Sequence, residues 1–254
     1  MFYDRKGSLL YVGKSTNISD RVVSHFSGDI SSAKHLQLMK ETADIDYIET
    51  AGELGALLTE SHLVKKLNPV YNRRLREKQM VYVLKTGKNS KGYSTLKTEM
   101  LNVRDIDPDS VFRIFNSKSG LKEYLVSFCD KYKLCPKLLS LESGSGSCFA
   151  HKLGKCKGAC VGRENKTLYN GRFLIATVQE RQFKKWPFQG VIEITEDNKE
   201  EEMWERFRFD RWSLVGRENN RGKAETFEPV FDIDIYSILS RYFRKNKGTN
   251  LKNS

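Results

Sequence analysis

Residues 53–72 read ELGALLTESHLVKKLNPVYN. Apolar residues recur there at intervals of three and four, which predicts a helix over residues 53–67 that ends before Asn68-Pro69, because proline disfavours continuation of a helix. A single carboxylate, Glu60, shares part of the apolar face, which is formed by Leu57, Val64 and Leu67. A buried carboxylate needs a cation or a metal as its partner. The stretch therefore predicts a helix and indicates metal-assisted chemistry at Glu60.

Elements on both sides of this helix predict an α+β chain. Before it, the pattern favours a strand at 8–13, helices at 17–26 and 32–42, and a strand at 46–50. After it, the pattern favours strands at 81–85, 111–115, 191–195, 203–209 and 212–215, and helices at 121–133, 164–183 and 233–244. We expect a boundary near residue 79. It would separate a domain at 1–78, with a short antiparallel sheet flanked by helices, from a C-terminal α+β region at 79–254.

The chain of 254 residues has 44 Lys and Arg against 32 Asp and Glu, a formal charge of +12. The basic residues cluster at Arg73, Arg74, Arg76 and Lys78, at Lys152, Lys155 and Lys157, at Lys184 and Lys185, and at Arg241, Arg244, Lys245 and Lys247. Such a surface favours a polyanion as a partner, because each neutralised phosphate releases counterions, although a basic protein without such a ligand has the same charge. No stretch resembles a membrane span or a signal peptide, which predicts a soluble, cytoplasmic protein.

Five cysteines lie between residues 129 and 160. Four of them follow the pattern C-x12-C-x7-C-x3-C, at Cys135, Cys148, Cys156 and Cys160. An odd number of clustered cysteines argues against a disulfide framework. Four thiolates suit either Zn²⁺ or an iron–sulfur cluster. The alternative is four reduced, unligated thiols, and we expect Cys129 to be a buried helix thiol.

Two blocks of the sequence resemble the GIY-YIG nuclease family. Residues 11–15 (YVGKS), followed by Asn17-Ile18 and Arg21-Val22, are similar to the second half of its signature. Residues 53–72 are similar to its glutamate helix and closing Asn-Pro-x-Tyr-Asn. The cysteine segment and residues 186–190 (WPFQG) resemble the UvrC/Cho excinuclease branch, and the resemblance covers about residues 1–195.

The resemblance implies a role for each polar residue of these blocks. Glu60 would bind one Mg²⁺ or Mn²⁺, which suits a carboxylate with waters and substrate phosphate, and Arg21 would grip the scissile phosphate. Tyr11 would be the general base or orient the water, and His25 would assist proton transfer. Lys14 would supply positive charge to the phosphate. Asn72 would connect the loop after the glutamate helix to the active-site strand. The alternatives are structural: Glu60 paired with Arg21 or a lysine, and ordinary surface side chains elsewhere.

The implied function is a DNA endonuclease that makes the 3′-side incision at damaged duplex DNA in nucleotide excision repair. Its partner would be a UvrB–DNA complex, the chain would be a monomer, and the cysteine quartet would hold a [4Fe–4S] cluster in preference to zinc. The alternatives are a catalytically impaired DNA-binding module and the C-terminal part of a proofreading exonuclease–GIY-YIG fusion. A homing-type GIY-YIG endonuclease would need a DNA-binding tail, and the last fifty residues show no such motif.

The start of the chain raises a further expectation. The family signature opens with Gly-Val/Ile-Tyr before a hydrophobic–Phe pair, and Met1-Phe2 occupy that pair here. The first tyrosine of the family site would therefore lie upstream of residue 1, and Tyr3 is out of position to replace it. We expect a mis-assigned start, a fragment, or impaired activity.

Overall fold

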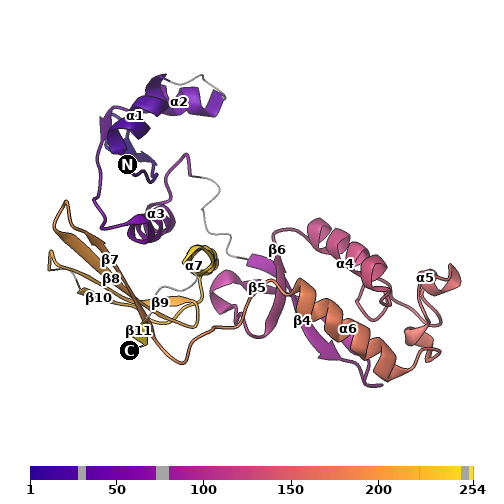
Figure 1. Ribbon diagram of the computed structural model, residues 1–254. Helices are drawn as coiled ribbons and strands as arrows, with labels where there is room; N and C mark the ends of the chain where they lie inside the picture. Colours follow the sequence, from indigo (N-terminus) through magenta and orange to yellow (C-terminus); the bar gives the residue numbers. More distant parts are fainter. Residues whose placement is uncertain (28–32, 73–79, 223, 247–251, 254) are drawn as a thin grey trace. The chain divides into compact units, whose positions relative to one another are not determined.

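The computed structural model describes residues 1–27, 33–72, 80–222, 224–246 and 252–253 (Figure 1). Two compact units form, one from residues 1–77 with 187–254 and one from residues 78–186. The expected region 79–254 is therefore divided, because residues 187–254 pack with the N-terminal segment. The expected boundary near residue 79 and the basic residues Arg73, Arg74, Arg76, Lys78 and Lys247 lie outside the described residues.

The first unit begins with a small antiparallel sheet in the order β2-β1-β3. Its elements are β1 (Phe2–Tyr3), β2 (Leu9–Tyr11), α1 (Ile18–Ser27), α2 (Ala33–Glu41), β3 (Asp44–Ile45) and α3 (Glu53–Leu67). Phe2, Leu10, Leu38 and Tyr71 form the core of this part. The strand predicted at 46–50 is wrong: β3 ends at Ile45, whose partner is Phe2. Asp46 still exchanges two backbone hydrogen bonds with Met1, and residues 47–50 follow as a loop.

Helix α3 has the bounds that its sequence predicts. Leu54, Leu58 and Val64 are buried along it, and burial of such side chains contributes about 1.5–3 kcal/mol each. The helix ends at Asn68, which adopts a left-handed conformation with φ 48° and donates its backbone N–H to the Val64 carbonyl at 3.0 Å. Asparagine tolerates this conformation better than most residues. The Asn68-Pro69 dipeptide therefore predicted the end of the helix and also contains the residue that ends it.

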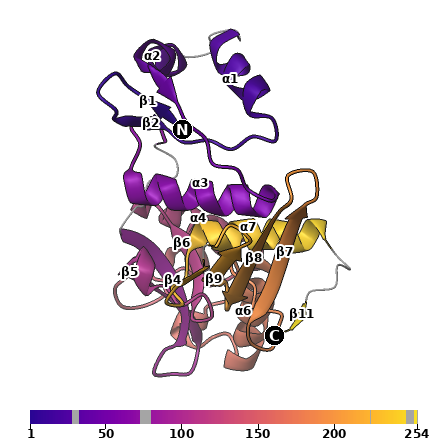
Figure 2. The same ribbon diagram turned by 90° about the vertical axis from the view of Figure 1, so that its left-hand side faces the viewer.

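A second sheet completes the first unit, in the order β10-β9-β8-β7-β11. Its elements are β7 (Ile192–Asn198), β8 (Met203–Asp210), β9 (Ser213–Asn219), β10 (Ala224–Thr226), α7 (Ile233–Lys245) and β11 (Lys252–Asn253). Every second residue of β8 is buried, as expected for a strand with one face on a core. Helix α7 packs beside α3 and against β9 (Figure 2). Residues far apart in the sequence thus surround α3.

The second unit is a three-stranded antiparallel sheet with helices. Its elements are β4 (Met80–Lys88), β5 (Ser94–Asn102), β6 (Val111–Phe115), α4 (Lys118–Tyr132), α5 (Phe149–Lys152) and α6 (Lys166–Glu180), and the strand order is β5-β4-β6. Strand β5 was not predicted. Four consecutive residues of this strand are exposed, and they are polar except for one isolated apolar side chain, so they show no strand pattern. The predicted α+β class is confirmed. No helix in the described ranges is long and apolar enough to cross a bilayer.

Candidate functional site

A cavity of about 440 Å³ in the first unit brings together five of the six predicted catalytic residues: Tyr11, Lys14, Arg21, His25 and Glu60. Tyr11 comes from the end of β2, Lys14 from the loop that follows, Arg21 and His25 from α1, and Glu60 from α3. Asn72 does not line this cavity and acts from outside it. Side chains up to 49 positions apart in the sequence therefore face one hollow, as expected of a site rather than of a scattered surface.

Glu60 is half-buried and makes no hydrogen bond or ion pair with another described residue. Burial raises the pKa of the Glu60 carboxyl, although Lys14 and Arg21 lower it. The structural alternative, a glutamate held in a salt bridge by Arg21 or a lysine, is not seen among the described side chains. A carboxylate exposed to a cavity without a partner fits a ligand for a hard divalent cation.

Two cations lie near the carboxylate. Arg21 is exposed on α1, and Lys14 is about one third exposed, with its Nζ 3.2 Å from Glu53 Oε1. Glu53 also forms an ion pair with Lys245 of α7, whose Nζ lies 3.2 Å from Glu53 Oε2. Lys14 is thus oriented by the start of the helix that carries Glu60. Together, the arginine fork and the lysine can bind phosphate oxygens that enter the cavity.

An aromatic cluster lines part of the same cavity. The centroid of the His25 ring lies 5.2 Å from the centroid of the Phe2 ring and 5.5 Å from that of the Tyr11 ring. His25 is 8% exposed, and neither of its ring nitrogens has a partner among the described atoms. Burial lowers the pKa of His25, and Arg21 and His35 lower it further. The imidazole is therefore neutral near pH 7 and can accept a proton.

His35 on α2 is half-buried beside this cluster. Its ring lies 5.1 Å from the His25 ring, and its Nε2 is 2.8 Å from the His25 carbonyl oxygen. His35, on the next helix, thus helps to hold His25 in place through contacts with its backbone and its ring. Spacing alone gave no signal for this pair, because the two residues lie on separate helices.

Asn72 links the segment after α3 to the end of β2. Its Oδ1 accepts from the Val12 N–H at 2.8 Å, and its Nδ2 donates to the Val12 carbonyl at 2.7 Å. The next bond of the same pairing runs from the Tyr71 N–H to the Leu10 carbonyl at 2.9 Å. The side chain, 8% exposed, imitates one more residue of a β ladder. It fixes the backbone between Tyr11 and Gly13.

Gly13 leaves room for the Tyr11 ring. A Cβ at Gly13 would lie 2.7 Å from Tyr11 Cε1 and 2.8 Å from its hydroxyl oxygen. We therefore expect Gly13→Ala to displace the phenol and to lower single-turnover DNA cleavage by about 10- to 100-fold, since a shift near 1 Å can have that effect. The unfolding midpoint should change little, because the ring can rotate outward. Gly171→Ala, in open space on α6, is the control and should cleave like the parent chain.

The same cavity contains residues that the sequence did not reveal. Thr59 lines it with a buried hydroxyl that has no described partner, and its only sequence signal is its position beside Glu60. Asn198 at the end of β7, Glu201 in the turn that follows and Met203 at the start of β8 also line the cavity. These residues lie outside the predicted domain at 1–78, so no pattern within that domain could indicate them.

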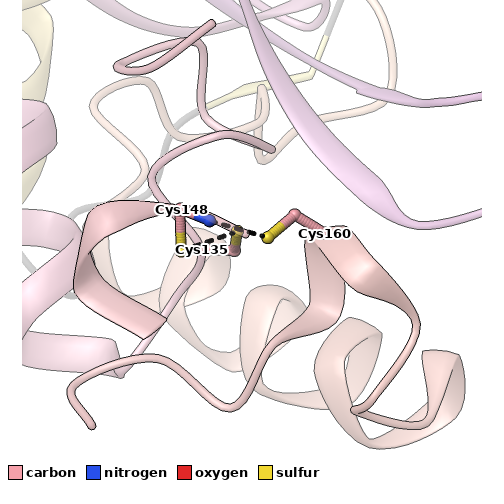
Figure 3. A group of neighbouring side chains, drawn as sticks. All are labelled: Cys135, Cys148 and Cys160. Carbon is pink, nitrogen blue, oxygen red and sulfur yellow. Dashed lines mark hydrogen bonds between the residues drawn. The ribbon is translucent and has the colours of Figure 1, made fainter. Parts of the chain in front are cut away.

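Three of the four predicted cysteine ligands gather in the second unit. The sulfurs of Cys135, Cys148 and Cys160 all lie within 4.8 Å of one another (Figure 3). Cys135 and Cys148 are 3.9 Å apart at Sγ, and the Cys148 N–H points to the Cys160 sulfur at 3.4 Å. Cys156, the fourth predicted ligand, is not part of this group; its sulfur accepts from the Gly158 N–H at 3.4 Å. Three clustered sulfurs, with no histidine or carboxylate among the described residues in the same group, fit a thiolate-bound metal centre.

The surroundings of the quartet are also compatible with unligated thiols. Cys135, Cys148 and Cys156 belong to the core of this unit, and burial raises the pKa of Cys148 to about 11. Cys129 lies apart from the quartet on α4, where burial raises its pKa to about 12. A buried thiol of this kind is inert and is a packing residue.

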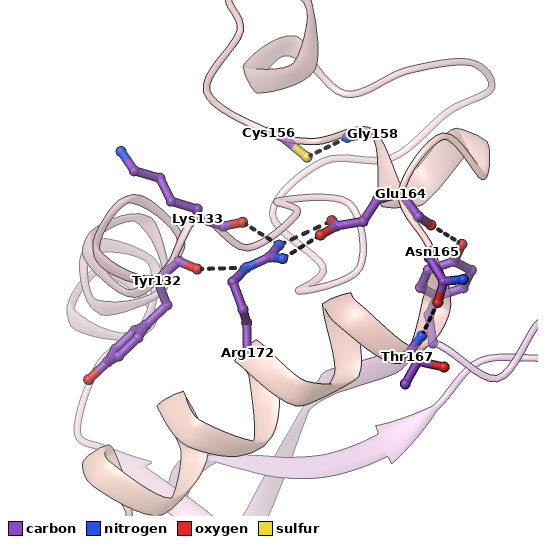
Figure 4. A network of polar contacts seen from close by, with 9 residues as sticks. Tyr132, Lys133, Cys156, Gly158, Glu164, Asn165, Thr167 and Arg172 are labelled. Atoms are coloured by element: carbon purple, nitrogen blue, oxygen red, sulfur yellow. Dashed lines mark hydrogen bonds and ion pairs between the residues drawn. The ribbon is translucent and has the colours of Figure 1, made fainter.

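A buried ion pair supports the cysteine segment (Figure 4). Arg172 on α6 donates to both carboxylate oxygens of Glu164, of which the Nη2–Oε2 contact is 3.1 Å. The same guanidinium donates to the carbonyls of Tyr132 and Lys133, at 3.4 and 3.0 Å. The Glu164 side chain is 4% exposed. One arginine therefore joins α6, the end of α4 and the segment after Cys160.

Comparison with known proteins agrees with both units. A profile described as the UvrC-like GIY-YIG domain matches residues 1–73, and one described as the UvrC/Cho excinuclease middle domain matches residues 83–178. Excinuclease cho of Escherichia coli (strain K12) is 31% identical over 240 residues, 91% of this chain and 77% of that protein. For Excinuclease cho of Salmonella typhi the identity is 31% over 250 residues, 95% and 80% of the two chains.

A longer relative matches more partially. The UvrABC system protein C of Hahella chejuensis is 31% identical over 161 residues, 63% of this chain and 26% of that protein. No solved structure matches the chain. The matched profiles and the identity across most of both chains, together with the cavity that gathers the motif residues, show that the chain belongs to the UvrC/Cho family of GIY-YIG excinucleases, which are DNA-repair nucleases.

Proposed function

We propose that this chain is a metal-dependent DNA endonuclease that makes the 3′-side incision at damaged DNA in nucleotide excision repair. The observation that carries the proposal is the half-buried, unpartnered Glu60 carboxylate in a cavity that it shares with Arg21 and Lys14. Family membership supports the nuclease class, and the side and site of the incision are our own inference. The runner-up, a DNA-binding module without activity, would not need this combination of groups.

In the proposed mechanism, Glu60 would hold one Mg²⁺ or Mn²⁺. The bound ion would supply positive charge to the phosphate oxygens and the leaving group. Arg21 binds the scissile phosphate through its planar fork, and Lys14 adds a second cation on the same side. These groups fix the phosphodiester so that a water can attack the phosphorus in line with the leaving oxygen.

The aromatic cluster handles the proton of that water. Tyr11 would orient the water, or would take its proton while passing its own phenol proton on to neutral His25, which packs on the Tyr11 ring. Asn72 keeps the Tyr11 backbone in place through its two bonds to Val12. The proposal thus assigns each of these residues a distinct task.

We further propose that the chain acts as a monomer in the cytoplasm on a UvrB–DNA complex. Its net charge of +12 favours contact with the phosphate backbone, which positions the protein without reading sequence. Recognition of the lesion would then belong to the partner. We therefore expect binding to weaken steeply as salt concentration rises.

A duplex with one defined lesion, labelled at either end of the damaged strand, tests the proposal in the presence of UvrB and Mg²⁺. We expect one incision on the 3′ side of the lesion and none when EDTA is added. Absence of cleavage would contradict the proposal if a variant that carries Gly-Val-Tyr before Met1 also failed to cut. Binding without cleavage by both chains would support the non-catalytic module instead.

We also propose that Cys135, Cys148, Cys156 and Cys160 hold a [4Fe–4S] cluster in preference to zinc. Protein purified without oxygen is expected to contain about four irons per chain and to absorb visible light. Cys148→Ser should lose most of this iron, whereas Cys129→Ala should keep it. One zinc without iron would contradict the cluster, and absence of both metals would favour four reduced thiols.

A further inference from the structure

We propose that residues 187–254 are the second half of the nuclease unit, in which Glu196 and Glu205 are positioning residues for the helix that carries Glu60. Neither matched family profile covers residues 187–254. The inference concerns how Glu60 is held, and its catalytic part rests on the function proposed above. Four groups of contacts support it.

The first is the cap of α3. The residue at the start of this helix, Gly52, has no side chain to satisfy the free N–H groups of the first turn. Glu196 of β7 supplies the cap instead: its two oxygens accept from Leu54 N at 2.8 Å and Gly55 N at 2.7 Å. A carboxylate at a helix N-terminus also interacts favourably with the helix dipole.

The second is a fully buried carboxylate one strand away. Glu205 of β8 is 0% exposed, and its Oε2 accepts from the Ala51 N–H at 3.0 Å. Its Oε1 accepts from Arg217 of β9 at 2.7 Å. Because an isolated buried charge is strongly unfavourable, these two bonds are what make this position possible. Glu205 therefore fixes the backbone immediately before α3.

The third is the pair of glycines that face these carboxylates. A Cβ at Gly52 would overlap the Glu196 carboxylate, and a Cβ at Gly55 would overlap Oε2 of Glu205. The backbone of Gly52 is extended, with φ −166°, so any residue could adopt it. Space for the carboxylates, and not backbone conformation, therefore accounts for glycine at position 52.

The fourth is the attachment of the rest of the helix. Lys65 of α3 lies 2.6 Å from Asp232 and 2.7 Å from Asp234, at the start of α7. Glu53 pairs with Lys245 at the other end of α7. Contacts from residues 187–254 thus hold both ends of α3, with Glu60 between them.

Glu60 lies five residues after Gly55, about 7.5 Å along the helix. A tilt or rotation of α3 would move the Glu60 carboxylate relative to Tyr11 and Arg21, which belong to other elements. A displacement near 1 Å at a reacting group can lower a rate about 100-fold. The carboxylates of β7 and β8 can therefore control cleavage without touching the substrate.

The test is a double-mutant cycle in the full chain. Glu196→Ala should increase hydrogen exchange at the Leu54 and Gly55 amides and lower kcat for cleavage about 10- to 100-fold, with KM for DNA nearly unchanged. Gly52→Asp alone should also impair cleavage, because its carboxylate overlaps and repels Glu196. In the Glu196→Ala background the same substitution has room, can cap α3 itself, and should restore both protection and kcat by at least about tenfold.

Glu200→Ala, in the exposed β7–β8 turn, is the matched control and should change neither readout. Unchanged exchange in Glu196→Ala, or failure of the double variant to regain protection, would overturn the positioning role. Unchanged kcat in a variant with lost protection would overturn the link to catalysis. If the parent chain cut no DNA, the proposed function would fail, while the exchange measurements would still decide whether Glu196 holds the helix.

Discussion

Glu60→Gln is expected to reduce DNA cleavage by about 10³-fold while the fold is retained, a loss in the range seen when one group that stabilises transition-state charge is removed. Glutamine has the same size as glutamate but offers only a neutral oxygen, which Mg²⁺ binds poorly in place of a carboxylate. Cleavage is measured in single turnover at saturating Mg²⁺, and DNA binding is measured separately in Ca²⁺. Cleavage within a few-fold of the parent chain would show that Glu60 is not the metal ligand.

The same substitution has a distinctive effect on stability. Burial raises the pKa of Glu60 above its ordinary value of 4.5, so its ionisation opposes folding. The favourable contribution of the protonated form is present at acidic pH and is lost as pH rises through the folded pKa. Glu60→Gln should therefore leave the free energy of unfolding unchanged at about pH 4. At about pH 8 it should increase the free energy of unfolding.

Glu53→Gln, on the same helix, is the control with the opposite sign. Hydrogen bonds from Lys245 and Lys14 lower the pKa of Glu53, so its charge favours the fold above pH 4.5. Its removal should slightly reduce stability at about pH 8 and have no effect at low pH. If both variants changed stability in the same direction, burial would not be the cause of the Glu60 shift.

Arg172→Met is expected to lower the free energy of unfolding of the second unit by about 3–5 kcal/mol, because it leaves Glu164 buried with an uncompensated charge. The carbonyls of Tyr132 and Lys133 lose a donor at the same time. Amide hydrogen exchange along α6 measures this unit alone, which avoids a two-state treatment of a two-unit chain.

Glu164→Gln in the Arg172→Met background removes the stranded charge. The double variant should be more stable than Arg172→Met alone, although the two carbonyls still lack their donor. A loss below about 1 kcal/mol in Arg172→Met would mean that the pair behaves as a surface salt bridge. Exchange in α3, in the first unit, serves as the internal control and should not change.

The sequence predicted the elements whose signals are local. Helix α3 has a clear 3.6-residue pattern and a proline after its end, so both of its ends were predicted. Strand β5 was missed because its last six residues are exposed or half-exposed and its partner, β4, decides its pairing. The segment 46–50 resembles a strand by composition, but within the described residues its pairing stops at Asp46, which bonds to Met1.

The same distinction applies to the site. Tyr11, Arg21 and Glu60 lie in compact motifs, so a resemblance could identify them before their geometry was known. Glu196 and Glu205 act across more than 140 positions, and no local pattern connects them to α3. One signal was nevertheless present: Glu205 alternates with the buried Met203, Phe207 and Phe209 in β8, as Glu60 does among leucines in α3. In both elements, a carboxylate at an apolar position of the pattern indicates a buried charge that needs a partner.

The division of the first unit also has a consequence for the order of events during translation. The cap on Leu54 comes from a residue 142 positions later, and residues 78–186 are made in between. The ribosome therefore finishes the cysteine unit before the last contacts of α3 can exist. A nascent chain that already contains Tyr11, Arg21 and Glu60 still has an unfinished nuclease. If Glu196 and Glu205 position α3 as proposed, full cleavage activity is expected only after synthesis has passed residue 205.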